Sequence, residues 1–376
     1  MNTLDPLRRS SLPALDGLRA IAVFLVIGLH LGYSWIPGYL GVLGFFVLSG
    51  FLITWLLARE FDTTGAISIR NFYCRRMLRI FPAFYCYLAV YVIYAAVNAI
   101  PIARGAIASA FFYVSDYFVV FQPPANFGLE HTWSLSVEEQ FYLLWPWIFR
   151  WQADHPKRLA RGLVWAMVLV QLWRPFLLYV WKTPNRHVMR AFDSQCDALL
   201  AGCLLAVLLK TQPASPVWHR LARSVYSPLA PLFALGGSFY LFWRWRAVGL
   251  SIGAAIAPYA FAILILQLIL LSARAPWSWL NWPTVRYLGR ISYPLYLYHR
   301  VTMQLGLTWT KTYPLAIQIA AGLGVTIATA SLSYFLMERP FLRRKSRVAL
   351  RSREPILFAR SASASGVLTA SARNSR

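Results

Sequence analysis

The sequence is poor in charged residues, and acidic residues are the scarcest of them. Charged side chains make up 13% of the 376 residues, whereas 58% are hydrophobic. A typical soluble domain is about a quarter charged. The chain has 13 Asp and Glu against 37 Lys and Arg, so its formal net charge is +24. This composition excludes an ordinary water-soluble domain.

Paired cysteines and internal repeats are lacking as well. The 4 cysteines contain no C-x-x-C pair, so the sequence indicates neither a disulfide framework nor a zinc site, and no metal is expected. An internal repeat with matched broken helices, which is typical of many transporters, is not found either.

Long apolar runs, in contrast, fill most of the chain. Several approach the roughly 20 residues that cross a bilayer. They cover 20–36, 39–57, 81–100, 138–149, 162–181, 197–209, 228–243, 248–272, 291–309 and 314–337. The sequence therefore predicts an all-α, polytopic integral membrane protein with about ten transmembrane helices around a central cavity.

The stretch 106–121 is also apolar, but it contains Asp116. If this stretch spanned the membrane, the basic run 150–161 would lie outside, against the tendency of Lys and Arg to stay in cytoplasmic loops. We therefore expect 106–132 to be an external segment or one that re-enters the protein.

The distribution of the basic residues along the chain agrees with this topology. Both termini are predicted to be cytoplasmic, with an N-terminus at 1–14, a transmembrane domain at 15–341 and a basic tail at 342–376. The tail has few aromatic residues and is predicted to be disordered, with anionic lipids as partners. Because topology and lipid account for most of the charge, nucleic acid is not an expected partner.

Two ionisable residues lie in the first predicted helix, where each is a functional candidate. Arg19 and His30 are eleven residues apart, which places them on nearly the same helix face about 16 Å apart. Both are then expected to face one cavity. The alternative is that Arg19 is a positive-inside anchor and His30 a helix-packing hydrogen bonder.

A basic segment precedes the third run. Arg76 and Arg79 share a helix face and can bind a phosphate through charge-assisted hydrogen bonds, whereas Arg75 points elsewhere. Lipid headgroups are the alternative partners of this segment.

Polar residues also mark three later helices. Ser136 and Glu139 fit a capping box, which leaves Glu138 either to orient a histidine or an acceptor hydroxyl or to interact with the helix dipole. Asp193 and Asp197 are most simply interpreted as helix caps. An interfacial aromatic belt is the simplest interpretation of Tyr293, Tyr296 and Tyr298. The role of His299 stays open.

Taken in order, these segments resemble the acyltransferase 3 family of bacterial membrane acyltransferases. The resemblance spans about 15–341 and rests on Leu15–Ala20 with His30, Phe45–Ile53, Arg76 and Arg79 before Pro82, Trp133–Glu138 with Phe141 and Tyr142, Ile291–Tyr296 with His299, and Glu338–Phe341.

The resemblance implies an O-acyltransferase of the bacterial cytoplasmic membrane. Such an enzyme moves an acyl group, here expected to be acetyl, from cytosolic acyl-CoA to a hydroxyl of a saccharide or lipid-linked sugar, with no permanently bound cofactor. The family's required arginine and histidine match Arg19 and His30, and its donor-associated arginine pair matches Arg76 and Arg79. His30, Arg19 and Glu138 are the expected catalytic residues: His30 as the general base, Arg19 with the CoA phosphates, and Glu138 on the path by which the acceptor enters. Direct transfer and a covalent intermediate both stay open.

Two positions depart from the family pattern. Leu43 stands where relatives commonly have an acidic residue before Phe-Phe, and Gln195 stands where many have arginine. The first departure removes the second-helix carboxylate that could act beside His30. A transporter or flippase of a glycoconjugate, and a scaffold without catalysis, are the alternative functions.

Overall fold

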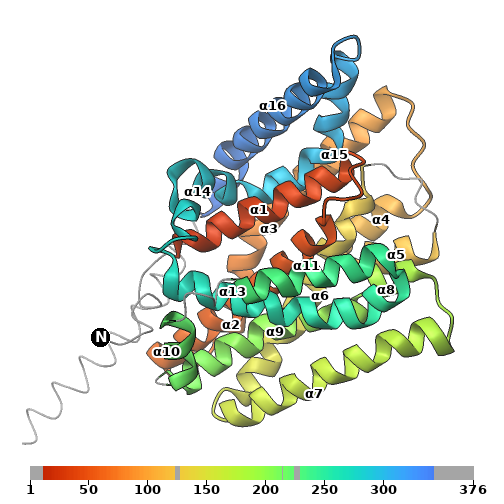
Figure 1. Cartoon of the computed structure of the whole chain (residues 1–376). Helices are drawn as coiled ribbons and strands as arrows, with labels where there is room; N and C mark the ends of the chain where they lie inside the picture. Colours follow the sequence, from red (N-terminus) through yellow and green to blue (C-terminus); the bar gives the residue numbers. More distant parts are fainter. Residues whose placement is uncertain (1–11, 123–127, 214, 224–228, 343–376) are drawn as a thin grey trace, which may run out of the picture.

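Helices make up the regular structure of the computed structural model, which describes residues 12–122, 128–213, 215–223 and 229–342 (Figure 1). No strand occurs in these ranges. The predicted all-α class is therefore confirmed. Nearly all of the tail at 342–376, and most of the N-terminus at 1–14, lie outside the described residues.

Ten long helices account for the ten predicted apolar runs. They are α1 (Pro13–His30), α2 (Gly38–Thr64), α3 (Ile69–Val97), α6 (Trp133–Gln152), α7 (Pro156–Pro175), α9 (Phe192–Thr211), α11 (Leu229–Arg244), α13 (Ala254–Leu271), α15 (Ser292–Trp309) and α16 (Leu315–Ser333). Shorter helices connect them: α4 (Ala106–Phe111), α5 (Ser115–Phe121), η2 (Glu130–Thr132), α8 (Asn185–Arg190), α10 (Pro216–Arg223), α12 (Arg246–Val248), η5 (Ser278–Asn281) and α14 (Pro283–Arg290). Three π-helical turns adjoin the long helices: η3 (Phe176–Val180), η4 (Gly249–Gly253) and η6 (Tyr334–Glu338).

Seven helical segments of the described chain are long and apolar enough to cross a membrane: Pro13–His30, Gly38–Thr64, Ile69–Val97, Pro156–Val180, Asn185–Thr211, Arg246–Leu271 and Leu315–Leu342. Helix α11 is shorter, with 16 residues, α6 carries Glu138, Glu139 and Arg150, and α15 is rich in polar side chains. The chain is therefore a multi-pass membrane protein. The count of about ten spans, the cytoplasmic termini and the central cavity stay predictions.

The segment predicted to lie outside or to re-enter is broken into α4, α5 and η2, so 106–121 is not one continuous helix. Asp116 in α5 is fully buried, and its carboxylate accepts hydrogen bonds from Gln140 Nε2 at 2.9 Å and from the Phe192 backbone N–H at 3.3 Å. These two bonds compensate for the burial of a polar group and tie α5 to α6 and α9.

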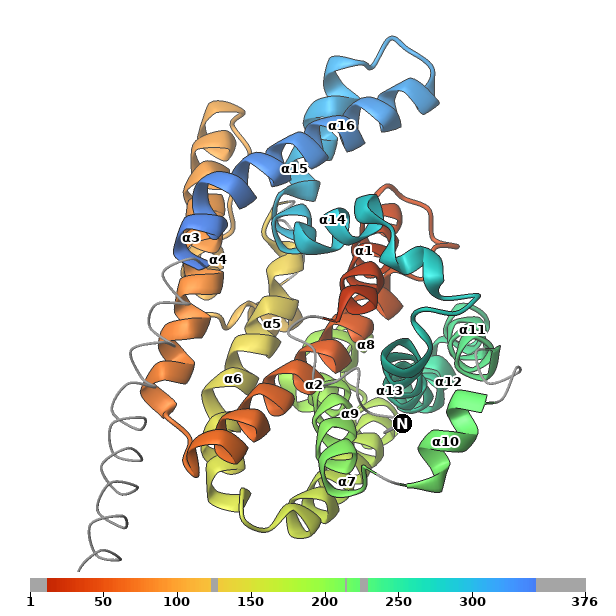
Figure 2. The same cartoon turned by 90° about the vertical axis from the view of Figure 1, so that its left-hand side faces the viewer.

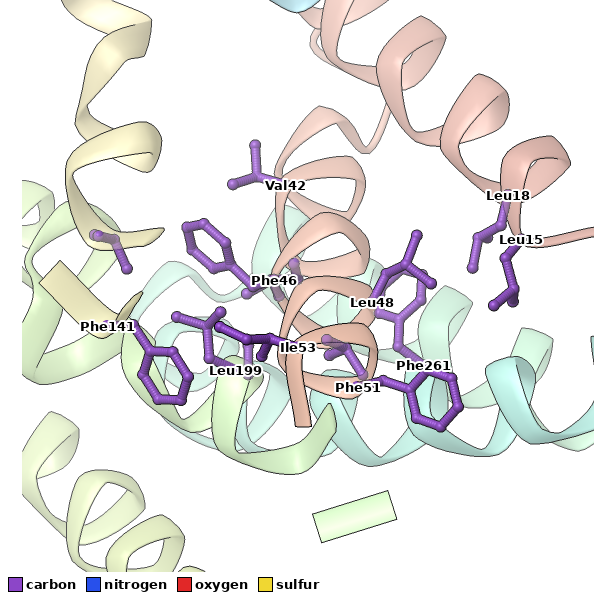
Figure 3. Packing of buried hydrophobic residues seen from close by; sticks show 14 of the residues in the cluster. Leu15, Leu18, Val42, Phe46, Leu48, Phe51, Ile53, Phe141, Leu199 and Phe261 are labelled. Atoms are coloured by element: carbon purple, nitrogen blue, oxygen red, sulfur yellow. The ribbon is translucent and has the colours of Figure 1, made fainter. Parts of the chain in front are cut away.

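Helix α2 lies at the centre of the core, packed against α1, α6, α9 and α13. In Figure 3 its side chains, among them Phe46 and Phe51, lie among Phe141 of α6, Leu199 of α9 and Phe261 of α13. Glycines let α2 and α9 approach closely, because a Cβ at Gly50 or Gly202 would overlap a backbone carbonyl oxygen of the opposite helix.

Helices α15 and α16 pack against each other, and their outer ends project from the rest of the molecule (Figures 1 and 2). The beginning of α15 lies against α1 and α3, and the Tyr293 hydroxyl donates to the Ile80 carbonyl oxygen at 3.0 Å. Helix α15 thereby brings residues near the end of the chain to the first helix.

Candidate active site

Three histidines from distant parts of the chain meet at the end of α1. His30 is the last residue of α1, His131 lies in η2, and His299 lies in α15. The ring centroids of His30 and His299 are 4.9 Å apart, and those of His131 and His299 are 5.2 Å apart. His131 and His299 are buried, whereas His30 is exposed. His30 is therefore the member of the group that a substrate can reach.

Hydrogen bonds assign the tautomers of the His30–His299 pair. His299 Nδ1 lies 2.7 Å from the Tyr296 carbonyl oxygen, which can only accept, so Nδ1 carries the proton. The Nε2 atom of neutral His299 is then an acceptor, and it lies 2.9 Å from His30 Nδ1. His30 therefore donates through Nδ1, and its Nε2 keeps the free lone pair that a general base needs.

His131 supports His299 from the other side. Its Nε2 lies 3.1 Å from the Leu297 carbonyl oxygen and donates to it, while its buried Nδ1 has no partner within the described part of the chain. Burial lowers the pKa of His131 well below its usual range, so this ring is neutral. Two neutral buried rings thus hold His30 in one orientation.

The arginines singled out in the sequence form a second group, with members on α1 and α3. Arg79 of α3 interacts electrostatically with Arg19 and Arg76, and all three act on the carboxylate of Glu138. Arg19 Nη1 also donates to Asp16 Oδ1 at 2.8 Å. These side chains are half-buried and keep accessible surface. The structure thus brings four of the five predicted site residues together.

Two neighbours fix the orientation of this group. The guanidinium of Arg76 lies over the Tyr142 ring, 4.1 Å from its centroid, and the Tyr142 hydroxyl is hydrogen-bonded to Ser49. Arg75 is directed elsewhere, because its Nη2 donates to Glu60 Oε2 at 2.7 Å. Arg76 and Arg79 therefore face the cluster while Arg75 does not.

Tyr296 interacts with residues of both groups. Its hydroxyl donates to the His131 carbonyl oxygen at 2.9 Å and lies 2.6 Å from Ser134 Oγ. The same side chain is within electrostatic reach of Glu138, Arg190 and Arg300. Glu138 interacts electrostatically with Arg76, Arg79 and Arg19, whereas the electrostatic partners of His30 are Arg300, His131 and Arg190.

The predicted aromatic belt is wrong. Tyr296 and Tyr298 are 6% and 5% exposed, and Tyr293 points inward to α3. Aromatic residues with a hydroxyl suit a membrane interface, but they suit a buried helix contact equally when the hydroxyl finds a partner. Here the hydroxyls of Tyr293 and Tyr296 each donate to a backbone carbonyl.

The predicted capping roles are also wrong. Helix α6 begins at Trp133 without a side-chain cap, and the Ser136 hydroxyl instead lies 2.8 Å from Ser115 Oγ. Helix α9 begins without a side-chain cap as well. Asp193 accepts hydrogen bonds from Trp173 Nε1 and His187 Nε2, and Asp197 forms a buried ion pair with Arg174. In each case the side chain binds a partner elsewhere in the chain and not the backbone N–H groups at the start of its helix.

The two departures from the family pattern are accommodated. Leu43 is buried in the hydrophobic core, and Gln195 donates through Nε2 to the Val188 carbonyl oxygen at 2.6 Å. Neither side chain leaves an unpaired charge.

Sequence reasoning missed a charged group beside His30. Arg190 Nη2 donates to Glu130 Oε1 at 2.6 Å, Arg300 Nη2 lies 3.7 Å from Glu130 Oε2, and both arginines act electrostatically on His30. Arg300 could have been found, because it is an ionisable residue in an apolar run, as His30 is. Arg190 lies in a short polar helix and carries no such signal.

Comparisons with known proteins agree with this arrangement. Residues 12–338 match the acyltransferase 3 model, described as an acyltransferase domain. The chain is 31% identical over 361 residues to the peptidoglycan O-acetyltransferase OatA of Listeria monocytogenes, covering 88% of this chain and 56% of that protein. It is 32% identical over 370 residues to a provisionally named O-acetyltransferase of Staphylococcus aureus, covering 88% of this chain and 57% of the relative.

The chain thus spans little more than half the length of these curated relatives. No solved structure matches it. The family match covers nearly all of the described helices and every residue of the two groups around Tyr296. It confirms the resemblance drawn from the ordered motifs, and the chain belongs to the acyltransferase 3 family.

Proposed function

We propose that this membrane acyltransferase moves an acyl group from acyl-CoA to a hydroxyl of a saccharide, with His30 as the general base. The observation that carries the proposal is the free Nε2 of an exposed histidine whose Nδ1 is held by buried His299. Membership of an acyltransferase family sets aside the transporter and scaffold alternatives. The saccharide acceptor is proposed because the relatives include a peptidoglycan O-acetyltransferase.

The chemistry assigned to His30 is proton removal. The acceptor oxygen attacks the thioester carbonyl carbon while His30 Nε2 takes the hydroxyl proton. The carbon–sulfur bond then breaks, the acyl group stays on the acceptor oxygen, and the leaving CoA sulfur takes the proton from His30. The two buried rings behind His30 keep its Nε2 directed at the acceptor throughout.

The donor is proposed to lie against the arginine group. Arg76 and Arg79 suit the phosphates of CoA, and Arg19 extends the same positive surface along α1. The electrostatic interaction of Glu138 with these three arginines offsets part of this charge. The thioester then reaches His30 past Tyr296, with the donor on the cytosolic side of a bacterial cytoplasmic membrane.

The test of this function is release of CoA thiol by the full chain in lipid nanodiscs. Acetyl-CoA is supplied with solubilised peptidoglycan fragments, and thiol appearance and acetyl ester formation on the sugar are followed together. We expect both in equal amounts, and neither without the saccharide. Absence of ester formation with every sugar tested would contradict the proposed function.

Replacing Arg76 or Arg79 with alanine is expected to weaken acetyl-CoA binding by about 1.5–3 kcal/mol, the value of a hydrogen bond to a charged group. Arg75→Ala is the matched control, because Arg75 pairs with Glu60 and should leave binding unchanged. Calorimetric titration of nanodisc-bound protein measures the affinity. Unchanged affinity in both variants would instead favour lipid headgroups as the partners of these arginines.

A further inference from the structure

Two arginines of α14 have no role in the site described above. Arg286 and Arg290 are four residues apart, so they lie on the same face of this helix. Arg290 is exposed and Arg286 is half-buried. Neither side chain forms an ion pair or a hydrogen bond with a residue in the described ranges, and the buried Nε of Arg286 has no acceptor there. Two guanidinium groups on one helix face are therefore available to an anion.

Helix α14 is held against the beginning of α1 by a close backbone contact (Figure 1). A Cβ at Gly289 would lie 1.7 Å from the Asp16 carbonyl oxygen, so a residue with a side chain could not approach α1 in this way. The Asp16 carboxylate accepts the hydrogen bond from Arg19, and Gly289 directly precedes Arg290. Arg19 and Arg290 therefore lie on the two sides of one contact between α1 and α14.

A hydrogen bond connects the same end of α14 to α3. Three residues after Arg290, the Tyr293 hydroxyl donates to the Ile80 carbonyl oxygen at 3.0 Å. Ile80 directly follows Arg79, one of the arginines proposed to bind the phosphates of CoA. Arg290 thus belongs to a short segment that contacts α1 near Arg19 and α3 near Arg79. Two independent contacts place the α14 arginines at the same end of the helix bundle as the proposed donor site.

The donor carries phosphate at two places. The nucleotide of CoA has a diphosphate at the 5′ position of its ribose and a separate phosphate at the 3′ position. Arginine binds phosphate oxygens through parallel N–H groups, and two arginines offset the charge of a phosphate monoester. Asp16, the carboxylate at the contact with α14, is bound by Arg19 at 2.8 Å. The α14 arginines thus keep their charge, and one arginine pair is present for each phosphate position.

We propose that Arg286 and Arg290 form a subsite for the 3′-phosphate of the CoA donor, while Arg76 and Arg79 bind its diphosphate. The inference rests on the proposed function, because it takes acyl-CoA as the donor. It makes the 3′-phosphate a determinant of donor choice. A lipid headgroup offers the same phosphate chemistry to arginines near the membrane surface, and the test separates the two sources.

The test compares acetyl-CoA with acetyl-3′-dephospho-CoA, which lacks only this phosphate. Each donor is titrated calorimetrically into the full chain in nanodiscs that contain phosphatidylglycerol, without a sugar acceptor. We expect acetyl-CoA to bind about ten- to a hundredfold more tightly, because the dephosphorylated donor forms no charge-assisted hydrogen bonds with the α14 arginines.

Variants of the two arginines show whether they cause this preference. Arg286→Gln and Arg290→Gln should each weaken acetyl-CoA binding by about three- to tenfold and leave the affinity for the dephosphorylated donor unchanged. An arginine with a merely structural role would lower both affinities together. Arg290→Lys should keep part of the preference, because an ammonium retains the charge but not the parallel N–H groups. Arg161→Gln is the matched control, since Arg161 is also exposed but lies on α7, which packs against α6 and α9.

Equal affinity of the wild-type chain for the two donors would overturn the inference. The same holds if both glutamine variants bind the two donors as the wild type does but retain less phosphatidylglycerol in native mass spectrometry, because lipid would then be the partner. These measurements need no acyl transfer. A preference for acetyl-CoA in a chain that never acylates a sugar would support the subsite and contradict the proposed function, while acylation from both donors at equal affinity would do the reverse.

Discussion

Replacing His30 with alanine is expected to lower acyl transfer by about two to four orders of magnitude, the usual contribution of a general base. The variant should still insert and fold, because His30 is exposed at the last residue of α1 and the substitution leaves no cavity in the core. Donor binding should persist, because the substitution leaves Arg19, Arg76 and Arg79 unchanged. Ester formation on the acceptor and acetyl-CoA affinity, measured on the same sample, separate the two effects.

Variants of His299 provide the control for the hydrogen-bond chain behind His30. In His299→Gln the amide oxygen can still accept the proton of His30 Nδ1, whereas in His299→Leu no acceptor remains. We expect the glutamine variant to retain more activity than the leucine variant at equal folded yield. If His30→Ala folds, binds donor and acylates at a rate near that of the wild type, His30 is a packing residue and the mechanism is wrong.

The all-α fold class could be predicted from the sequence, because long apolar runs indicate membrane-spanning helices. The basic run 150–161 led to the prediction that 106–121 is not a spanning helix, and the structure divides this stretch into the two short helices α4 and α5. The periodicity of α1 also placed Arg19 and His30 on nearly one face. What periodicity could not supply is the partner of each side chain.

Those partners come from far along the chain. His30 meets His299, which is 269 residues away, and Arg19 of α1 acts electrostatically on Glu138 of α6. Local patterns compete poorly with such contacts: Ser136 and Glu139 match a capping box, yet Ser136 is bonded to Ser115 from a different helix. When a local pattern already explains a residue, as the capping box did for Ser136, reasoning from the sequence does not look for a partner elsewhere in the chain. The tertiary partners of such residues are therefore the ones it misses.

The ion pair between Arg174 and Asp197 illustrates the same point. Both side chains are 0% exposed, and they join α7 to α9 within two membrane-spanning segments. Arg174 Nε also donates to the Ser194 carbonyl oxygen at 2.8 Å. In the sequence Asp197 resembled a helix cap, but its burial opposite a guanidinium makes it a large energetic feature of the membrane core.

Replacing Asp197 with alanine is expected to destabilise the protein by about 3–5 kcal/mol, because it leaves the Arg174 guanidinium buried without its counter-charge. The double variant Arg174→Met with Asp197→Leu should recover most of this loss. One nitrogen of Arg174 and one oxygen of Asp197 have no partner among the residues that the structure describes, so an apolar pair of similar volume gives up little. Unfolding free energy in mixed detergent micelles measures each variant.

The half-exposed pair of Lys210 and Asp62 provides the matched control. Its atoms are 2.8 Å apart, but its side chains are 24% and 57% exposed. Solvent screening reduces such a pair to about 0–1 kcal/mol, so Asp62→Ala should be nearly neutral. An Asp197→Ala variant as mild as Asp62→Ala would mean that water reaches the Arg174 site. A double variant less stable than Asp197→Ala alone would mean that the charged pair itself, and not the removal of one partner, decides how α7 packs against α9.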